Sequence, residues 1–146
     1  MSRLPPPPPG TVICYSYLWA HEHRAGLEEG RKHRPAAVVL AWQTEDGATK
    51  VAVLPVTHSP PADPETALEV PADVKAQLRL DADRSWIVLD ELNVFLWPGP
   101  DIRPVPGSSP PQWSYGRLPR GLFETLRQRL KALREARRTK TVPRTD

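Results

Sequence analysis

The sequence predicts a mainly β fold with a C-terminal helix, and three features carry this prediction. Short runs rich in β-branched and aromatic residues are separated by turns of glycine, proline and aspartate, which is typical of antiparallel strands. An Asp46-Gly47 pair between two apolar runs is a strong hairpin signal. Near the C-terminus, apolar residues recur every three or four positions, as in a helix. We expect a small, mostly antiparallel β-barrel or half-barrel followed by one helix, an α+β domain.

Length and composition narrow the class of protein. The 146 residues are about one domain, long enough to bury a core without a disulfide or a metal. The single cysteine, Cys14, lies among apolar and aromatic residues, so we expect a buried thiol and no internal disulfide. No apolar stretch approaches the ~20 residues of a membrane helix, and the N-terminal run of prolines is unlike a signal peptide. We therefore expect a cytoplasmic protein without membrane contact.

The N-terminal half is expected to form an arm, three strands and a long loop. Residues 1–9 are predicted to be a disordered, proline-rich arm outside the core, because prolines lack the amide donors of sheets and helices. Strands are expected at residues 11–19, 36–43 and 50–57. Pro35 is expected to begin the second strand, since proline is excluded from strand interiors. The polar residues 20–33 are read as a loop.

The C-terminal half is expected to complete the β core and add the helix. The expected elements are a short strand at 67–70, a helix at 72–78, strands at 85–89 and 93–97, a Pro/Gly-rich connection at 98–118, a helix at 119–138 and a frayed basic tail at 139–146. The long helix is predicted from one apolar stripe, formed by Leu122, Phe123, Leu126, Leu130 and Leu133. Residues 10–138 are thus one domain, with its β core at about 10–98.

Positive charge is concentrated near the C-terminus. From Arg117 onward, ten Lys or Arg residues stand against three Asp or Glu residues, giving +7, while the whole chain carries +3. The rest of the chain therefore carries −4. The basic face of the helix, with Arg127, Lys131, Arg134 and Arg138, is either a surface for nucleic acid or an acidic partner, or simply a solvated helix face.

Side chains suited to RNA cleavage stand at the ends of the expected strands. The 2′-hydroxyl of RNA is an internal nucleophile, so an enzyme needs a base, an acid and donors for the extra negative charge. Arg34 precedes one strand, Thr57 and His58 end the next, and Asp90 and Glu91 follow a later one. If these strands share a sheet, Arg34, Thr57, His58 and Asp90 converge on one edge. Tryptophans and tyrosines offer stacking surfaces for single-stranded RNA.

Other kinds of site have weaker signals. The loop histidines His21, His23 and His33 are additional catalytic candidates besides His58, and the sequence does not choose among them. His21 and His23 offer two metal ligands, but no cysteine cluster or HExxH pattern supports a metal site. The chain has no glycine loop for ATP or NAD and no serine-hydrolase motif. We expect no metal and no cofactor.

Three motifs resemble the MazF/PemK/Kid family of type II toxin–antitoxin toxins. The RPAAVVL segment that begins at Arg34 resembles the RPxxV(V/I) strand of these proteins. The VLPVT segment that ends at Thr57 is similar to their next strand, and SWIVLDE, ending at Glu91, is similar to a later one. The order, the spacing and the final helix agree over about residues 10–133.

The resemblance implies a small SH3-like barrel, a homodimer and a toxin that inhibits growth. Such toxins are metal-independent, sequence-specific endoribonucleases that cut single-stranded mRNA. A cognate antitoxin neutralises them by occupying the RNA groove, and contact with DNA is expected only through that complex. In the family, the matching arginine (Arg34) stabilises the cleaved phosphate, and Thr57, Asp90 and Glu91 match further site positions. The Kid branch implies Asp90 as the general base.

The chain also departs from the family pattern. Val88 stands where Kid-like members have an arginine two residues before the aspartate, and the Pro-rich segment 98–111 and the WSYG stretch at 113–116 are additions. Two alternatives therefore remain beside the toxin. One is a catalytically inactive module on the same barrel that binds nucleic acid or protein. The other is an interaction subunit that needs a cognate partner for stability.

Overall fold

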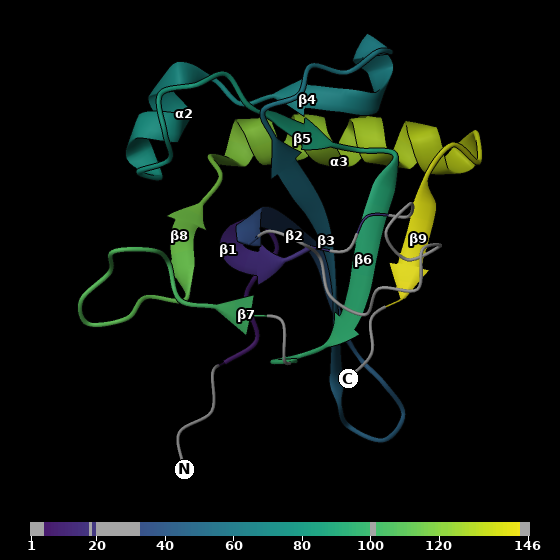
Figure 1. The fold of residues 1–146 in the computed structure, drawn as a ribbon. Coiled ribbons are helices and arrows are strands. Elements are labelled where there is room, and N and C mark those ends of the chain that lie inside the picture. The colour runs from purple at the N-terminus through teal and green to yellow at the C-terminus, as the bar shows by residue number, and fades with distance from the viewer. Residues whose placement is uncertain (1–4, 18, 20–32, 100–101, 144–146) are drawn as a thin grey trace.

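The computed structural model describes residues 5–17, 19, 33–99 and 102–143 (Figure 1). These residues form one nine-stranded β-sheet and a long helix, α3, which lies across it. The strands are β1 (Thr11–Ser16), β2 (His33–Gln43), β3 (Thr49–Thr57), β4 (Ala67–Glu69), β5 (Trp86–Val88), β6 (Glu91–Leu96), β7 (Ile102–Arg103), β8 (Ser114–Arg117) and β9 (Lys140–Pro143). The helical segments are the 3-10 turn η1 (Pro64–Thr66), α2 (Ala72–Gln77) and α3 (Arg120–Glu135). The prediction of a mainly β fold with a C-terminal helix is confirmed.

The sheet is open and almost entirely antiparallel. Its main path runs β4-β5-β3-β2-β1-β7, while β6 also pairs with β3 and β8 with β1. The last strand, β9, lies beside β6 and pairs with it in parallel (Figure 1). Among the described strands no pairing joins the outer members, so the sheet does not close into a barrel.

The β2–β3 hairpin aligns the two strands that carry the first site residues. The predicted turn is confirmed: Thr44 donates its backbone N–H to the carbonyl of Ala48 at 2.8 Å, and Gly47 has a positive φ of 85°. Only glycine adopts that φ readily, so Gly47 fixes the turn and hence the register. The register pairs Ala36 with Pro55, so Arg34 and Thr57 each lie two residues beyond the paired end of the hairpin.

Both faces of the sheet are buried, which explains why its strands read as continuous apolar runs. Neighbouring residues on a strand point to opposite faces, so Val12 and Ile13 belong to different core clusters. The Val12 cluster packs against α3, whose Leu126, Leu130 and Leu133 are buried, as the predicted stripe requires.

The structure corrects the prediction for Arg34 and Pro35. Both lie inside β2, which begins at His33, and Pro35 pairs with Cys14 of β1. The proline is tolerated because the β2–β3 pairs begin only at Ala36, so Pro35 lies outside the doubly paired part of the strand. Arg34 is therefore held by a strand rather than by a preceding loop.

The other corrections concern segments predicted to lack regular structure. The connection at 98–118 contains β7 and β8, and the tail predicted at 139–146 to be frayed contains β9. Pro7 of the predicted disordered arm is buried, and Pro9 accepts a hydrogen bond from Arg117 at 3.2 Å. No helix in the described part of the chain combines the length and the apolar character needed to cross a membrane.

Candidate functional site

Three of the predicted site residues line one pocket of about 540 Å³. Arg34 comes from β2, Thr57 from the end of β3 and Asp90 from the turn between β5 and β6. The hairpin register and the pairing of Thr57 with Trp86 of β5 bring these strand ends together. We call this hollow the Asp90 pocket. Its wall also contains Trp19 and Val88.

Arg34 is half-buried and rests on an aromatic side chain. Its guanidinium carbon lies 5.2 Å from the centroid of the Trp19 ring, within the range of a cation–π contact. Trp19 in turn meets Tyr17 edge-to-face, with the ring centroids 5.1 Å apart. The aromatic pair limits the positions that the guanidinium can adopt, which leaves a planar cation held at the pocket wall.

Thr57 is oriented by the turn that follows β3. Its Oγ1 accepts a hydrogen bond from the backbone N–H of Ser59 at 3.2 Å. Since that oxygen is the acceptor here, the hydroxyl hydrogen of Thr57 remains to be donated to a ligand. The side chain is half-buried and faces the same pocket as Arg34.

Asp90 and Glu91 differ in burial: Asp90 is half-buried in the turn before β6, and Glu91 is buried at the start of that strand. The carbonyl oxygen of Asp90 accepts the backbone N–H of Lys140 at 2.8 Å, which ties the turn to β9. Glu91 is the first residue of β6, is only 7% exposed and does not line the Asp90 pocket. Asp90 and Arg34 thus line one pocket, whereas Glu91 is buried and is not part of its wall.

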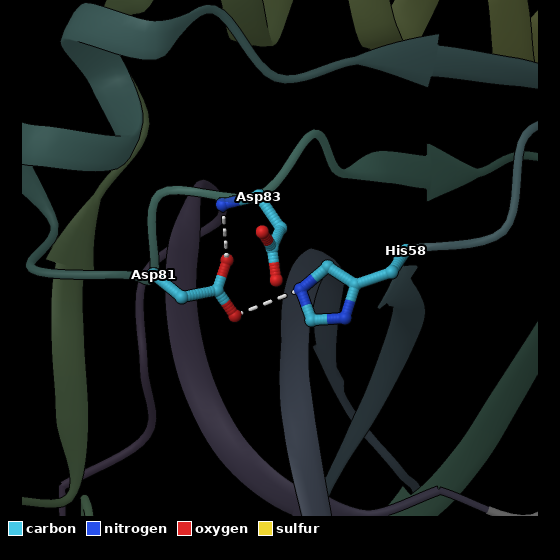
Figure 2. Close-up of side chains that lie close together, drawn as sticks. All are labelled: His58, Asp81 and Asp83. Atoms are coloured by element: carbon cyan, nitrogen blue, oxygen red, sulfur yellow. Dashed lines mark hydrogen bonds and ion pairs between the residues drawn. The ribbon is translucent and has the colours of Figure 1, made fainter.

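A second pocket, of about 450 Å³, adjoins the first and contains His58. The two hollows share Arg34, Thr57 and Ser59 in their walls. Figure 2 shows the His58 ring directed at Asp81, with Nε2 and Oδ2 2.7 Å apart. We call this hollow the His58 pocket. Asp81 was missed by sequence reasoning, because it lies 23 residues from His58 in the chain.

Asp81 is held from behind by a buried lysine. Lys75 of α2 has a side chain only 5% exposed, and its Nζ donates to Asp81 Oδ1 at 2.6 Å and to Ser85 Oγ at 2.7 Å. It also donates to the carbonyl of Asp83. The hydrogen bond from Lys75 to Asp81 is the main cause that keeps the pKa of the Asp81 carboxyl below its ordinary value. No spacing in the sequence marks Lys75 as buried.

The geometry of the His58 pocket does not fit a metal ion. One ligand atom each from His58, Asp81 and Asp83 lies within 4.8 Å of the others, and all three residues are exposed. However, the Lys75 ammonium lies 2.6 Å from Asp81 and would repel a cation at this carboxylate. Both Asp81 oxygens are already engaged by Lys75 and His58. We therefore assign no metal to this cluster.

Of the three loop histidines, the structure describes the backbone of His33 alone. His21 and His23 lie outside the described residues. His33 is the first residue of β2 and pairs with Ser16 of β1. His58 lines the same pocket as Arg34 and Thr57.

Part of the basic C-terminal segment is occupied within the chain. Arg138 pairs with Asp63 and, at 3.0 Å, with Glu65, and Arg129 donates to the carbonyl of Pro64 at 2.7 Å. These contacts fix the loop at one wall of the Asp90 pocket, since Asp63 lines it. Arg138 therefore has a structural partner, although the sequence placed it on an open basic face.

No protein-family model matches the chain, and no curated protein matches it either. The resemblance to the MazF/PemK/Kid toxins therefore depends on the motifs of the sequence.

Lys75→Met is expected to destabilise the fold by about 1–3 kcal/mol, because the Ser85 hydroxyl and the Asp83 carbonyl lose their buried donor. The folded pKa of Asp81 is lowered, so this contact stabilises above the ordinary value of 3.8 and its contribution is lost as pH falls through the folded value. The difference in the free energy of unfolding between the variant and the wild type should therefore become smaller at low pH. Urea unfolding at pH 7 and at low pH measures it. Lys131→Met, at an exposed helix position, is the control.

Proposed function

We propose that the protein is a toxin-like, metal-independent endoribonuclease of the MazF/PemK/Kid type that cleaves single-stranded mRNA and inhibits growth. The observation that carries this proposal is the meeting of Arg34, Thr57 and Asp90 in one pocket. A planar cation, a hydroxyl donor and a carboxylate are the groups that 2′-hydroxyl attack on a phosphodiester requires. These three residues come from three separate strand ends that the sheet brings together.

Each residue has a defined part in the proposed reaction. Arg34 donates to two phosphate oxygens, whose negative charge increases in the transition state. Asp90 removes the proton of the 2′-hydroxyl, and Thr57 donates its hydroxyl hydrogen to the phosphate. The exposed part of Trp19 at the pocket wall supplies a stacking surface for a base next to the cleaved bond.

The fold, assembly and partners proposed here follow the same family. We propose that the sheet is an open form of the SH3-like barrel of these toxins, with additions in β7 and β8. The active species is then a homodimer with RNA in a groove between protomers, and a cognate antitoxin occupies that groove. Support comes from the strand order β1-β2-β3 with a hairpin after β2 and from the C-terminal helix.

Asp90→Asn is expected to lower the rate of RNA cleavage by about 10²-fold or more, because the amide cannot accept the proton. The assay is cleavage of a long single-stranded RNA by the purified protein in EDTA, followed by gel. Asp73→Asn, an exposed aspartate of α2, is the matched control and should cleave at the wild-type rate. Equal rates for Asp90→Asn and the wild type would remove Asp90 from the mechanism.

One observation favours a second candidate, a catalytically inactive RNA-binding module. Val88, an apolar residue, lines the Asp90 pocket at the position of a catalytic arginine in the Kid branch. A module of this kind would bind RNA with an affinity that falls steeply with salt, and it would leave the RNA intact. Binding measured at two salt concentrations, with the RNA analysed afterwards, separates this candidate from the enzyme.

A further inference from the structure

The proposed reaction requires an acid for the leaving 5′-oxygen, and the sequence leaves this group open. The structure sets His58 in the hollow next to the Asp90 pocket, with Arg34, Thr57 and Ser59 common to both walls. His58 thus lines one hollow and Asp90 the other, and the shared residues belong to both. In-line displacement places the attacking and leaving oxygens on opposite sides of the phosphorus. A base and an acid in two adjoining hollows match this requirement.

The His58 ring is oriented by a chain of contacts that begins in the core. Lys75 is buried and fixes Asp81 Oδ1, and Asp81 Oδ2 lies 2.7 Å from His58 Nε2. Nε2 is therefore used by Asp81, and Nδ1 lies on the other side of the ring (Figure 2). A ring that carries a proton on both nitrogens donates Nε2–H to Asp81 and has Nδ1–H to transfer.

The charged groups around the ring come from three elements. Asp81 and Asp83 belong to the loop after α2, Arg34 to β2, and Lys75 stands behind Asp81 in α2. The Lys75 ammonium contacts Asp81, so the carboxylate lies between the ammonium and the imidazole ring. Asp81 thus links the buried Lys75 to the exposed His58 and orients the His58 ring.

We propose that His58 is the general acid of RNA cleavage and that Asp81 is its positioning residue, an inference that rests on the proposed endoribonuclease function. The 2′-oxygen forms a bond to phosphorus while the bond from phosphorus to the 5′-oxygen breaks. The proton of the 2′-hydroxyl goes to Asp90, and the Nδ1 proton of His58 goes to the departing 5′-oxygen. The products are a 2′,3′-cyclic phosphate and a 5′-hydroxyl.

The test compares two leaving groups in otherwise identical RNAs that contain one cleavage site. One RNA has the ordinary 5′-oxygen at the cleaved bond, and the other has sulfur there, which leaves as a thiolate without protonation. His58→Gln, which retains a hydrogen-bonding side chain, is expected to cleave the oxygen RNA about 10²-fold more slowly than the wild type. It is expected to cleave the sulfur RNA at nearly the wild-type rate. Asp90→Asn, which lacks the base, should remain slow on both.

The possible outcomes distinguish a failure of His58 as the acid from a failure of the proposed endoribonuclease function. If His58→Gln equals the wild type on the oxygen RNA, or is equally slow on both RNAs, His58 is not the acid, although the wild type still cleaves. If the wild type cleaves neither RNA, the endoribonuclease proposal fails and this inference fails with it. A rescue by sulfur in His58→Gln alone supports the proposal.

The role of Asp81 has its own readout, the comparison of the two leaving groups. In Asp81→Asn, the ring loses the carboxylate that orients it, so cleavage of the oxygen RNA is expected to slow while the sulfur RNA is cleaved at nearly the wild-type rate. Asp83→Asn is the matched control, because Asp83 lies in the same cluster and no hydrogen bond to His58 is assigned to it. Equal slowing of Asp81→Asn on both RNAs, or no slowing on the oxygen RNA, would overturn the positioning role.

Discussion

Arg34→Ala is expected to lower RNA cleavage by about 10³-fold, because it removes the cation from the wall that both pockets share. No other charged side chain lines both pockets among the described residues. The fold should survive, since Arg34 is half-buried near the start of β2 and alanine is compatible with a strand position there. The measurement is the single-turnover cleavage rate, with the circular dichroism spectrum and melting temperature as checks of the fold.

Two further variants make the Arg34 experiment specific. Arg34→Lys retains the charge but loses the planar fork that binds two phosphate oxygens, so an intermediate rate is expected. Arg84→Ala is the matched control: Arg84 also lies over a tryptophan, 5.0 Å from the Trp86 ring centroid, but lines neither pocket. It should cleave normally. Wild-type cleavage by Arg34→Ala would exclude Arg34 as the phosphate-binding group.

Leu126→Ala is expected to destabilise the protein by about 2–5 kcal/mol, the range measured for leucines whose removal leaves a cavity. Leu126 is completely buried and belongs to the cluster in which α3 covers the Val12 face of the sheet. Its loss therefore weakens the main contact between helix and sheet. Urea unfolding at equilibrium gives the free energy, and an unchanged m value shows that the folded state is retained.

The control for this substitution is Leu40→Ala. Leu40 is 43% exposed, so the same chemical change is expected to alter the free energy of unfolding by no more than about 0.5 kcal/mol. If Leu126→Ala were as harmless as Leu40→Ala, α3 would not be packed on the sheet as the structure has it.

The sequence predicted elements whose signal is local. The β2–β3 hairpin followed from Asp46-Gly47, and α3 followed from the leucine stripe, because turn chemistry and helical periodicity depend on near neighbours. The strands β7, β8 and β9 were missed since each has two to four residues, too few for a period to show. They exist because longer strands, β1 and β6, offer them edges for pairing.

Local sequence patterns likewise predicted some residues of the candidate site and missed others. Arg34, Thr57 and Asp90 were nominated as strand ends, and antiparallel pairing is enough to bring such ends together. Glu91 was nominated with Asp90, but it is buried as the first residue of β6 and does not line the pocket, and such burial is not visible in a local pattern of residues. Asp81 reaches His58 through a loop whose path depends on tertiary packing, which single-sequence patterns do not contain.

The central claim is cleavage of RNA by its own 2′-hydroxyl, and the ends of the fragments test it most directly. The wild-type protein is incubated in EDTA with a long single-stranded RNA, and the fragments are analysed by mass spectrometry. The account predicts discrete fragments with 2′,3′-cyclic phosphate and 5′-hydroxyl ends, and no cleavage where the nucleotide 5′ to the cut lacks its 2′-hydroxyl. Intact RNA in the presence of folded protein, or fragments with 5′-phosphate ends, would contradict it.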